Sequence, residues 1–139
     1  MLAFIYKTLA AIGYTEPIHP VSTHIPMGMI LGGFLFAIAS FKWEAAKETA
    51  HQCLILALAI LPITVVFGIM DWQYRLAGAV TVYIVAKLIL AGTLGILLGC
   101  NAYLYQKGKL GPRAFMALHI LCLLNAIGLG FIGGRLVYG

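Results

Sequence analysis

The amino-acid sequence is almost continuously apolar from residue 79 to residue 105, where it reads AVTVYIVAKLILAGTLGILLGCNAYLY, and Lys87 is the only charged residue in this stretch. A helix that crosses a bilayer needs about 20 apolar residues, because it rises about 1.5 Å per residue. This stretch is therefore long enough to span a membrane as one helix.

Three further apolar runs lie at residues 21–41, 52–70 and 114–134, with short polar connectors between them. Hydrophobic residues make up 63% of the chain and charged residues 9%, which excludes an ordinary water-soluble domain. Spans that face lipid must satisfy their own backbone hydrogen bonds, and helices do so. The sequence predicts an all-α integral membrane protein, with residues 19–139 forming a four-transmembrane-helix up-down bundle.

Residues 1–18 also begin apolar, but Lys7 interrupts the apolar stretch and no small-residue cleavage pattern follows before Pro17. We expect a short N-terminal interfacial helix here, not a signal peptide.

The connectors 42–50 and 106–113 carry five Lys and Arg residues, against three on the other side of the membrane. This bias predicts cytoplasmic connectors and periplasmic termini in a bacterial inner membrane. The net charge of +5 is spread over loop ends, which indicates contact with lipid headgroups and not with nucleic acid.

Polar residues are costly inside a bilayer, and in this chain they gather in two layers. The outer layer contains His19, His24, Asp71, Arg75, Lys87, Arg135 and Tyr138. The inner layer contains His51, Cys53, Cys100, Asn101, His119, Cys122 and Asn125. We expect the three cysteines to be small apolar fillers.

The segment from His19 to Pro26 reads HPVSTHIP and predicts a helix start. Ser22 or Thr23 can serve as the N-cap, and Pro26 is tolerated in a first turn because the amides there have no intrahelical partner. This reading places His24 in the first helical turn.

A b-type haem in a helical bundle needs imidazoles from facing helices and cations near the surface for its propionates. His51 and His119 lie on different helices of one leaflet and are a candidate axial pair. A second haem would use His24 with His19 or Met27. The candidate propionate partners are Arg75, Lys87 and Arg135, and Gly130 and Gly133 allow close approach of a helix or a flat cofactor.

Each of these residues also has a structural interpretation. Histidines at helix ends often serve only as interfacial hydrogen-bonding groups, and glycines often serve only helix packing. Asp71 and Lys87 are expected to form an ion pair at the membrane edge, or Lys87 to extend to the surface; alternatively, with Tyr138, they are candidates for proton uptake at a quinone site.

Three motifs resemble an uncharacterised family of small bacterial four-helix membrane proteins: residues 19–26, residues 68–72, which read GIMDW, and residues 133–139, which read GGRLVYG. The resemblance covers roughly residues 17–139. Members of that family also occur joined to Rieske-type iron–sulfur domains, which implies membrane electron transfer.

The resemblance implies functional or structural roles for His19, His24, Asp71, Gly133, Gly134 and Tyr138. The chain departs from the family in two places. Family members tend to have a histidine early in the third helix, where this chain has Lys87, and another after the closing Val-Tyr, where this chain has only Gly139.

The sequence therefore predicts a membrane electron-transfer subunit, either a b-type cytochrome with one or two haems or a quinone-reactive anchor of a respiratory complex. The expected partners are membrane lipid and an iron–sulfur or cytochrome subunit, or further copies of this chain. The alternative is a non-catalytic membrane scaffold without a cofactor.

Overall fold

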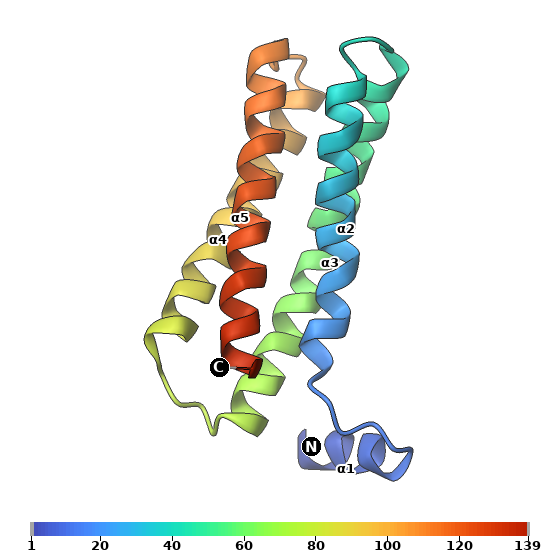
Figure 1. Cartoon of the computed structure of the whole chain (residues 1–139). Coiled ribbons are helices and arrows are strands. Elements are labelled where there is room, and N and C mark those ends of the chain that lie inside the picture. Colours follow the sequence, from blue (N-terminus) through green and yellow to red (C-terminus); the bar gives the residue numbers. More distant parts are fainter. Residues whose placement is uncertain (1, 139) are drawn as a thin grey trace.

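The computed structural model describes the backbone of residues 2–138 and the side chains of residues 3–136. Its five helices are α1 (Leu2–Ala11), α2 (Ile18–Ala39), α3 (Ala45–Arg75), α4 (Val82–Gln106) and α5 (Pro112–Tyr138), and no strand occurs in this part of the chain (Figure 1). The helices α2 to α5 are each long and apolar enough to cross a membrane. The predicted all-α membrane fold is confirmed.

The four long helices run up and down in sequence order and form two hairpins (Figure 1). Helix α2 packs along α3 and α4 along α5, and contacts of α2 with α5 and of α3 with α4 join the hairpins. We call the end that carries the α2–α3 and α4–α5 connectors the connector end. The opposite end is the terminal end, and there α1 lies roughly perpendicular to the long helices, beside the α2–α3 hairpin, and contacts α3 (Figure 1).

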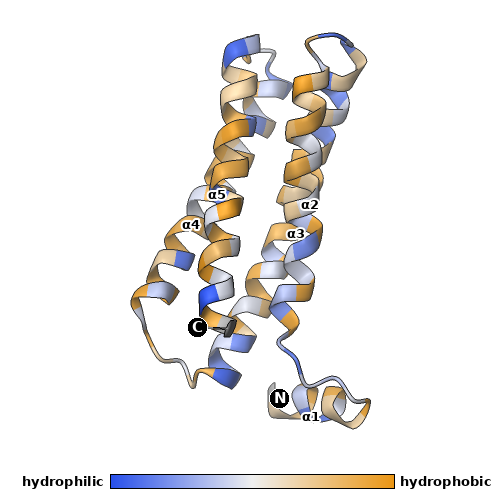
Figure 2. Cartoon of the chain, in the orientation of Figure 1, coloured by the Kyte–Doolittle hydropathy of each residue, from blue (hydrophilic) through white to orange (hydrophobic). Residues whose placement is uncertain are grey.

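Apolar residues cover the middle of the long helices, while hydrophilic residues lie mainly toward both ends (Figure 2). Large side chains such as Leu35, Ile89 and Leu124 are exposed on the outside of the bundle. Inside, Ile30, Leu54, Leu98 and Cys122 are almost completely buried and form the central core. An apolar exterior around a packed core is what a lipid-facing bundle requires.

The helices extend beyond the apolar runs that predicted them. Helix α3 begins at Ala45, whereas the run begins at residue 52, and it continues to Arg75. Glu48 in its first turn is favoured by the positive end of the helix dipole, so polar residues continue the helix outside the hydrocarbon. Hydropathy therefore located the apolar part of the helix but not the residues at which the helix begins and ends.

The predicted start of α2 is wrong. The hydroxyls of Ser22 and Thr23 donate to the carbonyls of His19 and Pro20, at 2.8 and 2.7 Å, so neither caps the helix. The helix begins at Ile18, which moves His24 beyond the first turn and leaves Pro26 buried inside the helix. The earlier start is possible because a side chain from another helix caps it, as described next.

Candidate functional site

The carboxylate of Asp71, near the end of α3, caps the start of α2. It accepts hydrogen bonds from the backbone N–H groups of Ile18 (3.3 Å) and His19 (2.7 Å). The first amides of a helix have no intrahelical partner, and a negative charge at that end is favoured by the helix dipole. Asp71, which is only 9% exposed, therefore fixes the position of α2 against α3.

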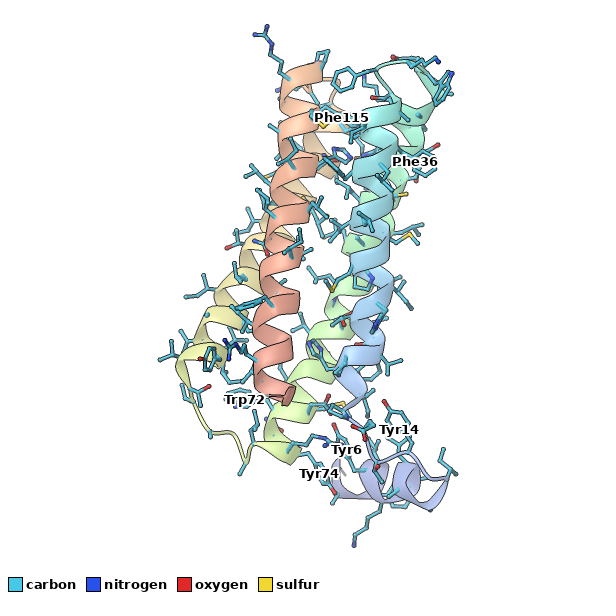
Figure 3. All side chains as sticks on the ribbon, in the orientation of Figure 1. Tyr6, Tyr14, Phe36, Trp72, Tyr74 and Phe115 are labelled. Atoms are coloured by element: carbon cyan, nitrogen blue, oxygen red, sulfur yellow. The ribbon has the colours of Figure 1, made fainter. Side chains whose placement is uncertain are left out.

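The hydroxyl of Tyr6 in α1 donates a further hydrogen bond to Asp71. Burial, together with this bond, raises the pKa of Tyr6 above its ordinary value, because the phenolate would be both desolvated and repelled by the carboxylate. The ring of Tyr6 also stacks on Tyr74 of α3, with 3.9 Å between centroids (Figure 3). These contacts hold α1 across the terminal end.

The imidazole of His19 lies between α2 and α3. Its Nδ1 donates to the carbonyl oxygen of Thr64, at 2.9 Å, which leaves Nε2 available to another partner. The ring covers Gly68, where a Cβ atom would lie only 3.0 Å from Nδ1. Gly68 and Asp71 are three residues apart on one face of α3, so α3 accepts both the ring and the first turn of α2.

Lys87 approaches this group from α4. It lies within electrostatic range of His19 and Asp71 without a hydrogen bond to either, and its Nζ atom lies 3.7 Å from where a Cβ on Gly133 of α5 would be. The expected ion pair with Asp71 is not formed; the one ion pair in the described part of the chain joins Lys47 and Glu44. The side chains of Tyr6, His19, Asp71 and Lys87 thus come from four helices, and we call them the Asp71 cluster.

The other residues predicted for this layer do not join the cluster. His24 is exposed, and its Nδ1 donates to the carbonyl of Pro20 in its own helix at 2.7 Å. Arg75 donates to the carbonyl of Thr15, and the guanidinium of Arg135 lies over the ring of Phe131 at 5.9 Å. The Nδ1 atoms of His24 and His19 thus bond to carbonyls of different helices, that of Pro20 in α2 and that of Thr64 in α3. The side chain of Tyr138 lies outside the described residues.

A second group of buried polar residues lies near the connector end, as the two-layer pattern implied. His51 of α3 is 3% exposed, stacks on Tyr105 of α4 at 3.9 Å, and has its Nδ1 3.5 Å from Oδ1 of Asn101. His119 of α5 is completely buried against Phe115. We call these five residues the histidine cluster.

Among the side chains of residues 3–136, two buried amide atoms have no hydrogen-bond partner: Nδ2 of Asn101 and Oδ1 of Asn125. Asn101 is completely buried and Asn125 is 9% exposed. An unpaired buried amide costs about 1–3 kcal/mol, so each is a weak point in the packing.

The histidine cluster does not fit a haem in this packing. Nδ1 of His119 donates to the carbonyl of Phe115 at 2.8 Å, which leaves Nε2 as the ligand atom, and Nε2 faces the carbonyl oxygen of Ala50 at 3.5 Å. An iron bound to Nε2 would need the space of that carbonyl. Tyr105 stacks on one face of His51 and does not cover its nitrogen atoms, so the obstacle to a haem between the two histidines is the Ala50 carbonyl of α3.

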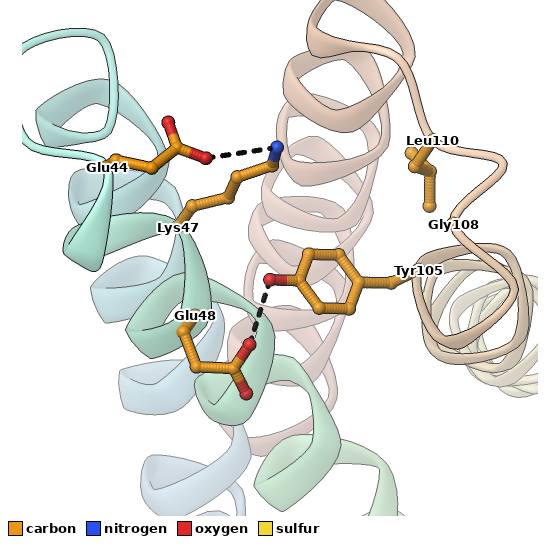
Figure 4. Close-up of a pocket in the computed structure, with 6 residues that line it drawn as sticks. All are labelled: Glu44, Lys47, Glu48, Tyr105, Gly108 and Leu110. Atoms are coloured by element: carbon orange, nitrogen blue, oxygen red, sulfur yellow. Dashed lines mark hydrogen bonds and ion pairs between the residues drawn. The ribbon is translucent and has the colours of Figure 1, made fainter.

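A hollow of about 480 Å³ opens beside the histidine cluster at the connector end (Figure 4). The hydroxyl of Tyr105 donates to Glu48 at 2.9 Å across it, and Nζ of Lys47 lies 3.5 Å from Glu44 on its rim. Tyr105 therefore lines this surface hollow and also stacks on the buried His51.

The two glycines expected to allow close packing differ from each other. A Cβ on Gly130 would lie 3.0 Å from Cε of Met27 in α2, which is a tight contact with a flexible side chain, whereas a Cβ on Gly133 would have only ordinary contact with Lys87, at 3.7 Å. The closest approaches to rigid groups occur at Gly33, against the Ala50 carbonyl, and at Gly68, against His19. Sequence reasoning also missed Tyr6 and Thr64. The spacing of Gly68 and Asp71 was visible, but nothing in the sequence indicated that His19 would lie against them.

Comparisons with models of known protein families, with curated proteins and with solved structures give no match. The resemblance to the four-helix family therefore stays a prediction from three short motifs.

Proposed function

We propose that this chain is a membrane electron-transfer subunit that binds a quinone at the Asp71 cluster. The observation that carries the proposal is the meeting of ionisable side chains from four helices, those of Asp71, His19, Tyr6 and Lys87, at the terminal end of the bundle. Ionisable groups at membrane depth usually have a function.

Two of these side chains suit the polar oxygens of a quinone and its quinol. Nζ of Lys87 is a hydrogen-bond donor that forms no ion pair within residues 3–136, and Nε2 of His19 has no protein partner there. A quinone carbonyl accepts a hydrogen bond, which the Lys87 Nζ can donate; in the neutral imidazole whose Nδ1–H donates to Thr64, Nε2 is an acceptor and suits the hydroxyl of the quinol. The apolar helices around them suit the ring and its isoprenoid tail.

Reduction of a quinone to a quinol consumes two electrons and two protons. The electrons would come from a redox partner, an iron–sulfur or cytochrome protein, as the sequence predicts. The protons would come through groups at the edge of the membrane, where the Tyr6 hydroxyl donates to Asp71. Under the Lys and Arg bias, this end would face the periplasm of a bacterial inner membrane.

The two tryptophans of the chain provide the test, because one lies at each end of the bundle. Trp72 follows Asp71 directly, whereas Trp43 lies in the α2–α3 connector. Quinones quench tryptophan fluorescence at short range. A short-tailed quinone added to the protein in nanodiscs should quench Trp72 in a Trp43→Phe variant, with saturation, and should have little effect on Trp43 in a Trp72→Phe variant.

Lys87→Met should weaken the saturable quenching by about tenfold, because a charge-assisted hydrogen bond contributes about 1.5–3 kcal/mol. Lys109→Met makes the same change at the connector end and serves as the control. Equal quenching of both tryptophans without saturation would favour the scaffold interpretation, in which Asp71 only caps α2.

A further inference from the structure

A second hollow, of about 300 Å³, lies on the outside of α5 at the connector end. It is lined by Phe41, Pro112, Arg113, Met116, Ala117 and Ile120, and we call it the α5 hollow. Five of these residues lie on one face of α5, and Phe41, which follows α2, forms the facing wall. The hollow therefore joins the two hairpins on the lipid side of the bundle.

The polarity of the α5 hollow changes with depth in the membrane. Arg113 lies at the start of α5, and Ile120 lies seven positions further along, which is about 10 Å deeper at helical rise. The residues between them that line the hollow, Met116 and Ala117, are apolar. A cation at the surface above an apolar floor matches a phospholipid, which has a phosphate above acyl chains.

Charge distinguishes the two hollows at this end. Glu44 and Glu48 line the other hollow, whereas no acidic residue lines the α5 hollow. Lys42 is the neighbour of Phe41 in the chain, and Lys109 lies in the connector before α5. An anionic headgroup would meet Arg113 with this positive charge around it.

Arg113 itself is available to a ligand. It is exposed and forms no ion pair in the part of the chain that is described. In contrast, Nζ of Lys42 lies over the ring of Trp43 at 5.3 Å, and Nζ of Lys107 lies over that of Tyr103 at 6.0 Å. Arginine binds phosphate with two parallel hydrogen bonds, which makes it suited to hold one headgroup in place.

We propose that the α5 hollow binds an anionic glycerophospholipid, with its phosphate at Arg113 and the upper part of one acyl chain between Phe41 and the Met116–Ile120 face. The lipid would hold the α2–α3 connector against the start of α5. This site is independent of the proposed quinone site, because the two lie at opposite ends of the bundle.

Native mass spectrometry of the detergent-solubilised protein tests the proposal, with phosphatidylglycerol and phosphatidylcholine of identical acyl chains as probes. We expect more bound phosphatidylglycerol than phosphatidylcholine. Arg113→Gln should weaken phosphatidylglycerol binding about fivefold, the effect of one basic residue at an anionic surface. Arg135→Gln, which removes an exposed arginine at the terminal end, should leave it unchanged.

Ala117→Phe provides a second variant, because it fills the hollow without changing the charge. It should also reduce phosphatidylglycerol binding, and circular dichroism should show that all variants keep their helix content. Equal loss in the Arg113 and Arg135 variants, or full binding in the Ala117 variant, would mean that lipid only coats the surface and would overturn the proposal. Equal binding of the soluble headgroup, glycerophosphoglycerol, would overturn it in favour of a phosphate site.

Discussion

Adding one methyl group at Gly68 tests how tightly His19 fits against α3. In Gly68→Ala the new Cβ would lie 3.0 Å from Nδ1 and 3.1 Å from Cε1 of His19, whereas ordinary contacts begin at 3.4 Å. The ring must therefore move by about 0.4 Å. It cannot do so freely, because Nδ1 is bound to the Thr64 carbonyl at 2.9 Å and the His19 amide to Asp71 at 2.7 Å.

Overpacking of this kind costs about 1–3 kcal/mol, and alanine in place of glycine in a helix returns about 0.5–1 kcal/mol. We expect Gly68→Ala to lower the free energy of unfolding by about 1–2 kcal/mol, measured by titration with sodium dodecyl sulfate in mixed micelles. Gly92→Ala is the matched control, because a Cβ at Gly92 meets nothing within 4 Å.

A double-mutant cycle isolates the contact itself. In a His19→Ala background the clash is gone, so Gly68→Ala should then stabilise the protein by about 0.5–1 kcal/mol, the gain from helix propensity. The reasoning is refuted if Gly68→Ala is as stable as Gly92→Ala, or if its cost is the same with and without the imidazole.

Four further outcomes are expected. Asp71→Ala should destabilise the bundle by about 1–2 kcal/mol in the same titration, because the first amides of α2 lose their cap. The raised pKa of Tyr6 adds stability that is fully present below pH 10, the unfolded value, and is lost as the pH rises above it; Tyr6→Phe should remove this alkaline decline in thermal stability. Asn125→Leu should be neutral or stabilising in thermal unfolding, since it removes a buried amide oxygen that has no partner, and a large loss would show that Oδ1 has a partner such as water. The dithionite-reduced absorption spectrum of the purified protein should lack a haem b α-band, and stoichiometric haem would show that the packing around His51 and His119 opens.

Most of the fold could be predicted from the sequence, because the apolar runs are much longer than any short core helix and their connectors are too short for other arrangements. The helix ends could not, since hydropathy falls where lipid ends and a helix can continue into water, as α3 does before His51. The prediction of where α2 begins was wrong for a different reason. Ser22 and Thr23 are good local caps, but the cap is Asp71, about 50 residues away in sequence.

The candidate site was predictable in its layers and not in its pairings. His19, Asp71 and Lys87 were all assigned to one layer, and His51 and His119 to the other. Which nitrogen faces which group depends on helix rotation, and a single sequence carries little information about rotation. Tyr6 was missed because α1 was treated as a surface segment, whereas its hydroxyl reaches a buried carboxylate.

The cap that Asp71 places on α2 has a consequence for membrane insertion. During synthesis α2 leaves the ribosome before α3. The first turn of α2 therefore lacks its capping carboxylate until Asp71 has been translated. The Ile18 and His19 amides stay with water or headgroups until the α2–α3 hairpin closes. The first turn of α2 is therefore completed only after both helices have entered the membrane. A translation arrest before Asp71 should leave this turn of α2 frayed.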